Sequence, residues 1–197
     1  ETLGERTGPL ISNPVSGEWV AELVPPSETD GTAHSALFLI AGEGPPPHYH
    51  VESEERFEVL HGELLVEREE ETQRLSAGES VTVAPGTIHK PRYAGDDYAA
   101  VIASVRPAGK TLSLLQTLFG LTHEGKVDDT GRPGLLQALT MTHGFRDDTV
   151  FLSPPPTITK PVAALVAPLC RQFGYRSTYE KYETERFWQR HVEQPPS

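Results

Sequence analysis

The sequence predicts a mainly β protein in which an antiparallel barrel or sandwich is followed by α-helices. Over the first 105 residues, short apolar runs are separated by turns rich in Gly, Pro and Asp. Such spacing favours a barrel or sandwich over alternating strand–helix units. After Pro107, apolar residues instead recur at helical spacing. We therefore expect a β-barrel in residues 1–107 and, in residues 108–197, a helical extension that packs on the barrel and is not an independent domain.

The strand pattern recurs along the first half of the chain, and each repeat is bounded by turn residues. Ala36 to Ala41 is largely apolar, as in a buried strand, whereas Val81 and Val83 alternate with polar neighbours, as in a half-buried one. In chain order the predicted strands are Glu18 to Val24, Ala36 to Ala41, Arg56 to Leu60, Glu63 to Arg68, Thr72 to Leu75, Ser80 to Ala84, Lys90 to Tyr93 and Tyr98 to Val105.

Three segments after Pro107 predict helices: Leu112 to Leu121, Gly134 to His143 and Lys160 to Phe173. The polar stretch between the first two reads as a loop. The run Pro154-Pro155-Pro156 predicts a stiff connector outside any helix, because proline lacks the backbone N–H that a helix interior needs.

The third segment is the clearest helix. Its apolar residues at helical spacing are Val162, Leu165, Val166, Leu169 and Phe173. A helix cannot bury such a face alone, so we expect it to pack on the barrel or on a partner subunit. Pro168 is expected to kink the helix or divide it, Gly174 to end it, and Cys170 to lie in the core.

Composition limits the partners of the chain. It has 197 residues, enough for one domain with a core, and a net charge of −11. That charge disfavours nucleic acid, which needs clustered Lys and Arg, and also adsorption to an anionic membrane. The single cysteine, Cys170, allows no internal disulfide and fits a reducing compartment, so we expect a cytoplasmic protein.

Residues with metal-binding side chains gather in two short segments. His48 and His50 point to one face of a strand, because side chains two residues apart share a face. Glu55 begins the next strand and shares its face with the apolar Phe57 and Val59, which indicates the interior. An inward carboxylate is costly unless it is paired or bound to a cation. This pattern predicts a metal site inside the barrel.

The second segment brings one more imidazole. Pro85-Gly86 predicts a turn, and we expect the glycine to supply a backbone geometry that lets His89 point inward. Three imidazoles and one carboxylate form a suitable set of direct ligands for a divalent transition metal. The predicted metal ligands are His48, His50, Glu55 and His89.

These two segments resemble the paired motifs of the cupin superfamily. The first motif, over residues 42–62, matches at Gly42, His48, His50, Glu55 and Gly62. The second, over residues 78–93, matches at Gly78, Gly86 and His89. Ala84 stands where the family has proline and Tyr93 where it has asparagine; neither position is a metal ligand. The resemblance covers about half of the chain, from Val20 to Val105.

The resemblance implies a cupin-type antiparallel β-barrel, or jelly roll, around one divalent metal. The ligand types suit Fe, Mn, Ni, Cu or Zn and do not choose among them. The family includes dioxygenases, decarboxylases, isomerases and lyases, and in such enzymes Glu55 could also serve as a catalytic proton acceptor. It also implies a small-molecule substrate or ligand and a homodimer.

The lead hypothesis is a metal-dependent oxidoreductase, dioxygenase-like, acting on a small organic substrate. It rests on a complete ligand set with no separate recognition module attached. The competing hypothesis is a non-catalytic cupin that binds or senses a small molecule. A metal-dependent isomerase or lyase is a third alternative, for which the motifs offer no basic cluster to hold a phosphate.

Overall fold

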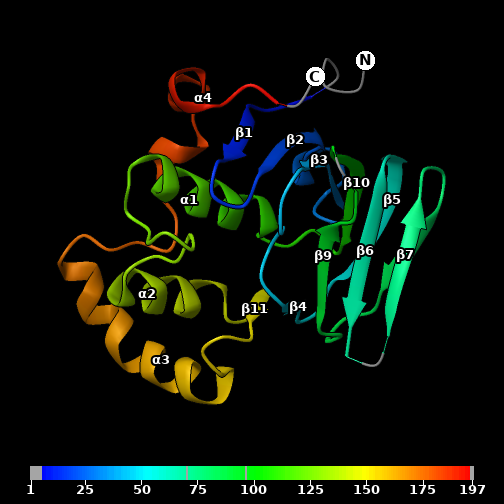
Figure 1. Ribbon diagram of the computed structural model, residues 1–197. Helices are drawn as coiled ribbons and strands as arrows, with labels where there is room; N and C mark the ends of the chain where they lie inside the picture. Colours follow the sequence, from blue (N-terminus) through cyan, green and yellow to red (C-terminus); the bar gives the residue numbers. More distant parts are fainter. Residues whose placement is uncertain (1–5, 70, 96, 196–197) are drawn as a thin grey trace.

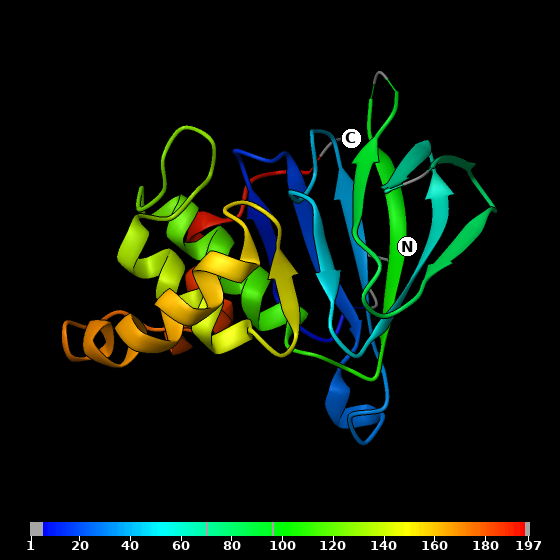
Figure 2. The same cartoon turned by 90° about the horizontal axis from the view of Figure 1, so that it is seen from below.

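The computed structural model describes residues 6–69, 71–95 and 97–195, and it consists of two antiparallel β-sheets with helices on one side (Figure 1). The second view also shows the helices grouped beside the sheets (Figure 2). This is the mainly β, jelly-roll architecture with C-terminal helices that the sequence predicts. None of the helices in the described ranges is long and apolar enough to cross a membrane.

The first sheet has six strands, and its inner face forms most of the barrel wall. Their order across the sheet is β1 (Leu10–Asn13), β2 (Glu18–Val24), β3 (His34–Ile40), β10 (Ala99–Arg106), β5 (Glu54–His61) and β8 (Ser80–Val83). All neighbouring strands run antiparallel. The sequence prediction missed β1, a strand of only four residues.

The second sheet has five strands and carries most of the metal-binding side chains. Their order is β11 (Thr149–Phe151), β4 (His48–His50), β9 (His89–Tyr93), β6 (Glu63–Arg68) and β7 (Thr72–Ser76). Strand β11 comes from the C-terminal half of the chain and pairs antiparallel with β4. The sequence prediction missed β11 as well, because three residues are too few to show the alternation of apolar and polar residues that marks a strand.

The barrel core lies between the two sheets. Phe57 and Val59 on β5 pack with Leu64 and Val66 on β6 and with residues of β10. The prediction that Phe57 and Val59 face the interior is therefore confirmed, and Glu55, which shares their face, is buried as well.

Four α-helices follow or flank the second sheet: α1 (Thr111–His123), α2 (Leu135–Phe145), α3 (Pro156–Gln172) and α4 (Glu185–His191). The described ranges also contain two 3-10 turns, η2 (Pro26–Glu28) and η3 (Glu180–Glu183). The first and last α-helices pack on the first sheet, where Phe119 and Trp188 contact Ile11 and Val20.

The expectation that Pro156 lies outside any helix is wrong. Pro156 begins α3, because the first helical position needs no backbone N–H. Pro168 neither divides the helix nor ends it, since α3 continues from Pro156 to Gln172 with Pro161 and Pro168 inside. The carbonyls four residues earlier, which lose their helical partners, belong to the exposed Thr157 and Ala164, where water can satisfy them.

The apolar face predicted for α3 does not pack on the barrel. Leu165 is 81% exposed, Phe173 74% and Leu169 56%. The helix instead buries its small residues Ala163 and Ala167, together with Cys170, which is buried as expected.

Candidate metal centre

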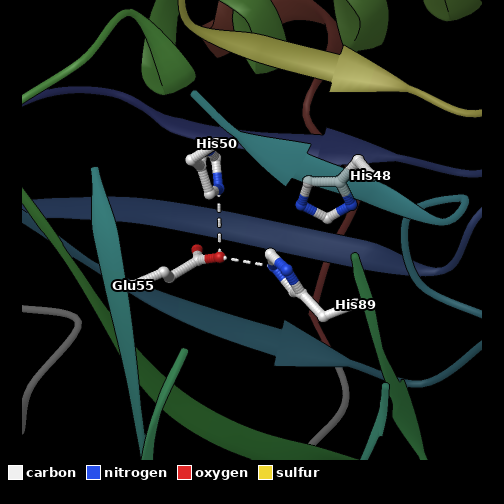
Figure 3. A group of neighbouring side chains, drawn as sticks. All are labelled: His48, His50, Glu55 and His89. Carbon is white, nitrogen blue, oxygen red and sulfur yellow. Dashed lines mark hydrogen bonds and ion pairs between the residues drawn. The ribbon is translucent and has the colours of Figure 1, made fainter. Parts of the chain in front are cut away.

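The four predicted ligands meet inside the barrel. His48, His50, Glu55 and His89 are all buried, and one potential ligand atom from each lies within 4.8 Å of those of the other three. Figure 3 shows the imidazoles of His50 and His89 directed at the Glu55 carboxylate, with His48 beside them. The sequence prediction that these residues converge agrees with the structure.

Strand geometry explains the convergence. His48 and His50 lie on one face of β4, and His89, the first residue of β9, pairs in register with His48. The turn before β9 depends on Gly86, whose φ of 76° lies in the left-handed region that glycine adopts without steric cost. The Gly86 N–H donates to the His50 carbonyl at 2.7 Å and so ties this turn to β4.

Backbone carbonyls fix the tautomers of two imidazoles. Nδ1 of His48 lies 2.9 Å from the Pro46 carbonyl, and Nδ1 of His89 lies 2.9 Å from the Thr87 carbonyl. A carbonyl oxygen only accepts, so both Nδ1 atoms must carry the hydrogen and donate. The lone pair of the neutral ring is then on Nε2, the atom available to a metal.

The third imidazole is held by the C-terminal half of the chain. Nδ1 of His50 lies 3.1 Å from Oγ1 of Thr149 on β11. The Thr149 hydroxyl donates to Oδ2 of Asp148 at 2.9 Å, so it can accept from the His50 ring. Asp148 is itself fixed by the Lys110 N–H, which donates to Oδ1 at 2.8 Å. All three rings therefore have Nδ1 engaged by an oxygen, which leaves Nε2 as the atom for a metal. Nε2 of His50 and Nε2 of His89 also contact the Glu55 carboxylate.

Charge is distributed unevenly over the cluster. Burial raises the pKa of Glu55, but hydrogen bonds from His50 (3.1 Å) and His89 (2.9 Å) outweigh it and hold that pKa well below its usual range. Burial lowers the pKa of His50, yet the Glu55 carboxylate raises it overall. For His48, burial and repulsion from His89 lower the pKa to about 3, so its ring is neutral.

This donor set fits a divalent transition metal. The distances of 2.9 and 3.1 Å from Glu55 Oε2 to the two imidazole nitrogens resemble the ~3 Å separations between adjacent ligands whose bonds to a metal are about 2.1 Å. Three neutral nitrogens and one carboxylate suit several first-row ions. Without a cation, the same carboxylate is stabilised by protonated His50.

An apolar cavity of about 50 Å³ adjoins the cluster. Its walls include Phe38 and Phe57 from the sheets, Phe151 from β11, and Leu114 and Leu115 from α1. The helical half of the chain therefore supplies part of the wall around the site. The volume holds a group of few heavy atoms and is well below the roughly 300 Å³ of pockets that enclose drug-sized ligands.

A second carboxyl group lines this cavity. Glu18, at the start of β2, is only 3% exposed. Burial raises its pKa to about 7, although a hydrogen bond with Ser16 opposes the shift. A carboxyl in this range can hold its proton and donate a hydrogen bond. Sequence reasoning missed Glu18, but a signal existed: it shares a strand face with the inward-pointing Val20.

A larger surface hollow, of about 200 Å³, lies outside the barrel. Glu52, Lys110 and Asp147 line it, together with the outer side of Asp148, and it includes none of the four predicted ligands. The small buried cavity, and not this larger one, adjoins the residues with metal-binding chemistry.

Comparisons with known proteins agree with the motifs. Residues 37–105 match the family model described as "Cupin domain". A curated relative, "Uncharacterized protein YdbB" of Bacillus subtilis (strain 168), is 44% identical over 46 residues, which are 23% of this chain and 41% of the relative. The match thus spans less than half of either protein.

Among solved structures, KdgF from Halomonas sp. is 21% identical, with a TM-score of 0.44, and the match covers 52% of this chain and 91% of that one. The polyketide cyclase RemF from Streptomyces resistomycificus is 16% identical, with a TM-score of 0.45 and coverage of 53% and 76%. A sugar phosphate isomerase from Silicibacter pomeroyi is 15% identical, with a TM-score of 0.42 and coverage of 50% and 69%. Likenesses this distant transfer no activity.

Proposed function

We propose that this chain, whose residues 37–105 match the "Cupin domain" family model, binds one divalent metal and acts on a small organic molecule. The observation that carries the proposal is the arrangement of the imidazoles. Each ring has Nδ1 engaged by an oxygen, and the rings of His50 and His89 direct Nε2 at the buried Glu55. A histidine cluster without a metal would not require all three rings to be oriented by a contact to Nδ1.

The ligands we propose are His48, His50, Glu55 and His89, with Fe, Mn, Ni, Cu or Zn as the ion. Four protein ligands leave one or two positions on a five- or six-coordinate ion. A bound metal would supply Lewis acidity or redox chemistry at those positions. The residues of the chain would orient the ligands, exclude water with apolar cavity walls, and accept or donate protons beside the ion.

Of the reactions open to such a site, we propose an oxidoreductase of the dioxygenase type. Supporting this, the cavity is lined mainly by apolar side chains and suits dioxygen together with one small substrate group. The Glu55 carboxylate can accept a proton from an enol or thiol. Glu18, which keeps its proton to about pH 7, can donate a hydrogen bond to a substrate oxygen.

Oxygen uptake tests this proposal. Protein loaded separately with iron, nickel or copper would be mixed in air with a panel of small enols and thiols. We expect uptake with at least one metal and substrate pair, and its loss in Glu55→Gln if the carboxylate accepts the proton. Metal-loaded protein that consumes no oxygen with any member of the panel would exclude the oxidoreductase.

A specific observation favours one alternative, a non-catalytic binding or sensor cupin: the cavity is small enough to be filled by the ligand alone. That function predicts tight binding that Glu55→Gln leaves unchanged, without turnover. An isomerase or lyase acting on a phosphate ester lacks such support, because no Lys or Arg lines the cavity within the described ranges.

We also propose a cytoplasmic location, which the single cysteine of the sequence supports.

A further inference from the structure

Exposed apolar side chains are concentrated on two helices outside the barrel. Nine large apolar residues of the described chain are exposed, and seven of them belong to α2 and α3 or directly follow α3. They are Leu135, Leu136, Ile158, Val162, Leu165, Leu169 and Phe173. We call these seven residues the α3 surface.

The α3 helix turns its large side chains outwards. It lies at the periphery, on the outer side of α2 (Figures 1 and 2). Its inner face is made of Ala163, Ala167 and Cys170, whereas Leu165 and Leu169 are 81% and 56% exposed. A helix that only covered α2 would gain more by burying its leucines than its alanines, since burial of a leucine contributes roughly 1.5–3 kcal/mol.

The outward face has the spacing of a helix-pairing seam. Ile158, Val162, Leu165 and Leu169 follow one another at intervals of four, three and four residues. Intervals that alternate between four and three residues are those at which apolar side chains recur where one helix packs against another by knobs into holes. The residues of the seam are aliphatic and, in two cases, β-branched, as at the core positions of paired helices.

The exposed area matches what a dimer requires. Together the seven side chains expose on the order of 700 Å², if a fully exposed side chain of this size is taken as about 180 Å². This is close to the ~800 Å² that each partner contributes to a standard-size interface, and it exceeds the largest apolar patch of a typical monomer, roughly 300–600 Å².

Charge permits the surface to face a copy of itself. The α3 helix contains no acidic residue, and its two basic residues, Lys160 and Arg171, each lie two positions from seam residues and so point elsewhere. The Lys160 ammonium lies 5.9 Å from the centre of the Tyr49 ring, on the barrel side. Two identical seams can therefore meet without like-charge repulsion.

We propose that two copies of this chain form a dimer in which the α3 surface of one protomer packs on the α3 surface of the other. A two-fold axis closes such a contact and leaves no open end. The Gln137 amide donates to the Arg176 carbonyl at 2.7 Å, so the start of α2 adjoins the segment after α3. Leu135 and Phe173 therefore belong at the same edge of the α3 surface. Insertion into a membrane surface is less suited, since such helices carry a strongly basic face.

The molar mass in solution tests the proposal. One chain has a mass of 21.6 kDa. Light scattering coupled to size exclusion should give twice this value for the native protein and the single-chain value for Leu165→Glu/Leu169→Glu. Both substitutions are at exposed positions, so an unchanged circular dichroism spectrum should show that the variant is folded. Leu60→Glu, at an exposed apolar residue of β5, is the matched control and should stay dimeric.

Cysteine cross-linking provides a second readout that does not depend on disrupting the surface. The native Cys170 is buried, so a new cysteine at position 162, 165 or 169 is the reactive one. In antiparallel helices related by a two-fold axis, the position nearest the axis should form a disulfide-linked dimer on mild oxidation, and Leu60→Cys should not.

The proposal would be overturned if the native protein were monomeric at about 100 µM, a concentration above the Kd of an ordinary dimer. It would also be overturned if the double variant remained dimeric, or if none of the three cysteine positions formed a cross-link. Binding of the native monomer to anionic vesicles, lost in the double variant, would assign the surface to a membrane instead. None of these readouts depends on the metal.

Discussion

Each ligand imidazole depends on an oxygen that accepts its Nδ1–H, and Thr149 supplies the one that is not a backbone carbonyl. Substituting Thr149→Val removes this acceptor without changing the side-chain volume greatly. The His50 ring is then free to change tautomer and turn, so metal affinity should fall by roughly 10- to 100-fold. Competition with a chromophoric chelator measures this loss.

Thr149→Ser is the matched control, because it keeps the hydroxyl that lies between His50 and Asp148. Its affinity should stay near the native value. Equal losses in the valine and serine variants would mean that the hydroxyl does not orient His50.

Glu18 predicts a specific dependence of stability on pH. In the folded protein its pKa is raised from 4.5 to about 7 by burial, so between these values the folded state holds a proton that the unfolded state has lost. Stability therefore falls as pH rises through this range, by up to about 3 kcal/mol. Glu18→Gln cannot ionise, so its stability relative to the native protein should increase with pH.

Urea unfolding of both proteins between about pH 5 and pH 8 measures that difference. Glu28→Gln, at an exposed position of η2, controls for the loss of one acidic side chain. A constant difference between Glu18→Gln and the native protein across the range would show that Glu18 is ionised when folded.

At the residue scale, the sequence predicts which four side chains converge but not the residues that orient them. His48, His50 and Glu55 follow from strand alternation, and His89 follows from the turn before it. Thr149 lies 99 residues from the His50 that it contacts, and no local pattern connects them. Only the pairing of β11 with β4 brings the two together.

At the scale of elements, α1 packs closely against η3 because the contacting residue of α1, Gly120, has no side chain. A Cβ on Gly120 would lie 2.3 Å from the ring of Tyr182, which is fully buried and donates a hydrogen bond to Glu124 at 2.9 Å. The ring has little freedom to move. Gly120→Ala should therefore lower the free energy of unfolding by roughly 1–3 kcal/mol, even though alanine favours helix formation.

Thermal unfolding measures this effect, with Gly134→Ala as the control. Gly134 precedes α2, and a Cβ there would meet no heavy atom within 4 Å. Its melting temperature should stay near the native value. If both variants melt alike, the contact between α1 and Tyr182 is not as tight as the geometry indicates.

Elements with a clear period are also those that the sequence predicts well. Glu18–Val24 and Glu63–Arg68 have the predicted bounds, and the three long helices lie where apolar spacing indicates. β11 is missed because it is short and is stabilised by its neighbour. Pro156 is assigned wrongly because the rule applied to it concerns helix interiors, whereas Pro156 stands at the first helical position.

At the scale of the whole molecule, we propose that residues 108–197 do not form an independent domain. Trp188 on α4 is 1% exposed and packs in one cluster with Ile11 and Val20 of the first sheet. Trp188→Ala should cost about 3–5 kcal/mol. Because the cluster is shared, the strands and the helices should lose this stability together.

Fluorescence and circular dichroism can follow the unfolding of the sheet and of the helices separately. Trp19 on β2 remains as a fluorescent reporter of the sheet in Trp188→Ala, while circular dichroism reports the helices. Both signals should show one transition at a lower denaturant concentration. A helix transition that moves while the Trp19 transition stays in place would indicate two independent units.

The same half of the chain completes the candidate site, since it supplies Thr149, part of the cavity wall and one sheet edge. Substrate specificity is thus expected to depend on α1 and β11 as much as on the barrel. The proposed ligands come from motifs within residues 42–62 and 78–93, but the residues that surround them come from both halves of the chain.

Metal content shows whether the four clustered residues hold an ion. Protein reconstituted with a divalent transition metal, then freed of excess ion and measured by elemental analysis, should hold one ion per chain. His48→Ala and His89→Ala should hold much less, while His61→Ala, at an exposed histidine outside the cluster, should match the native protein. A native protein that retains none of the five candidate metals, or variants that retain as much as the native protein, would contradict the account.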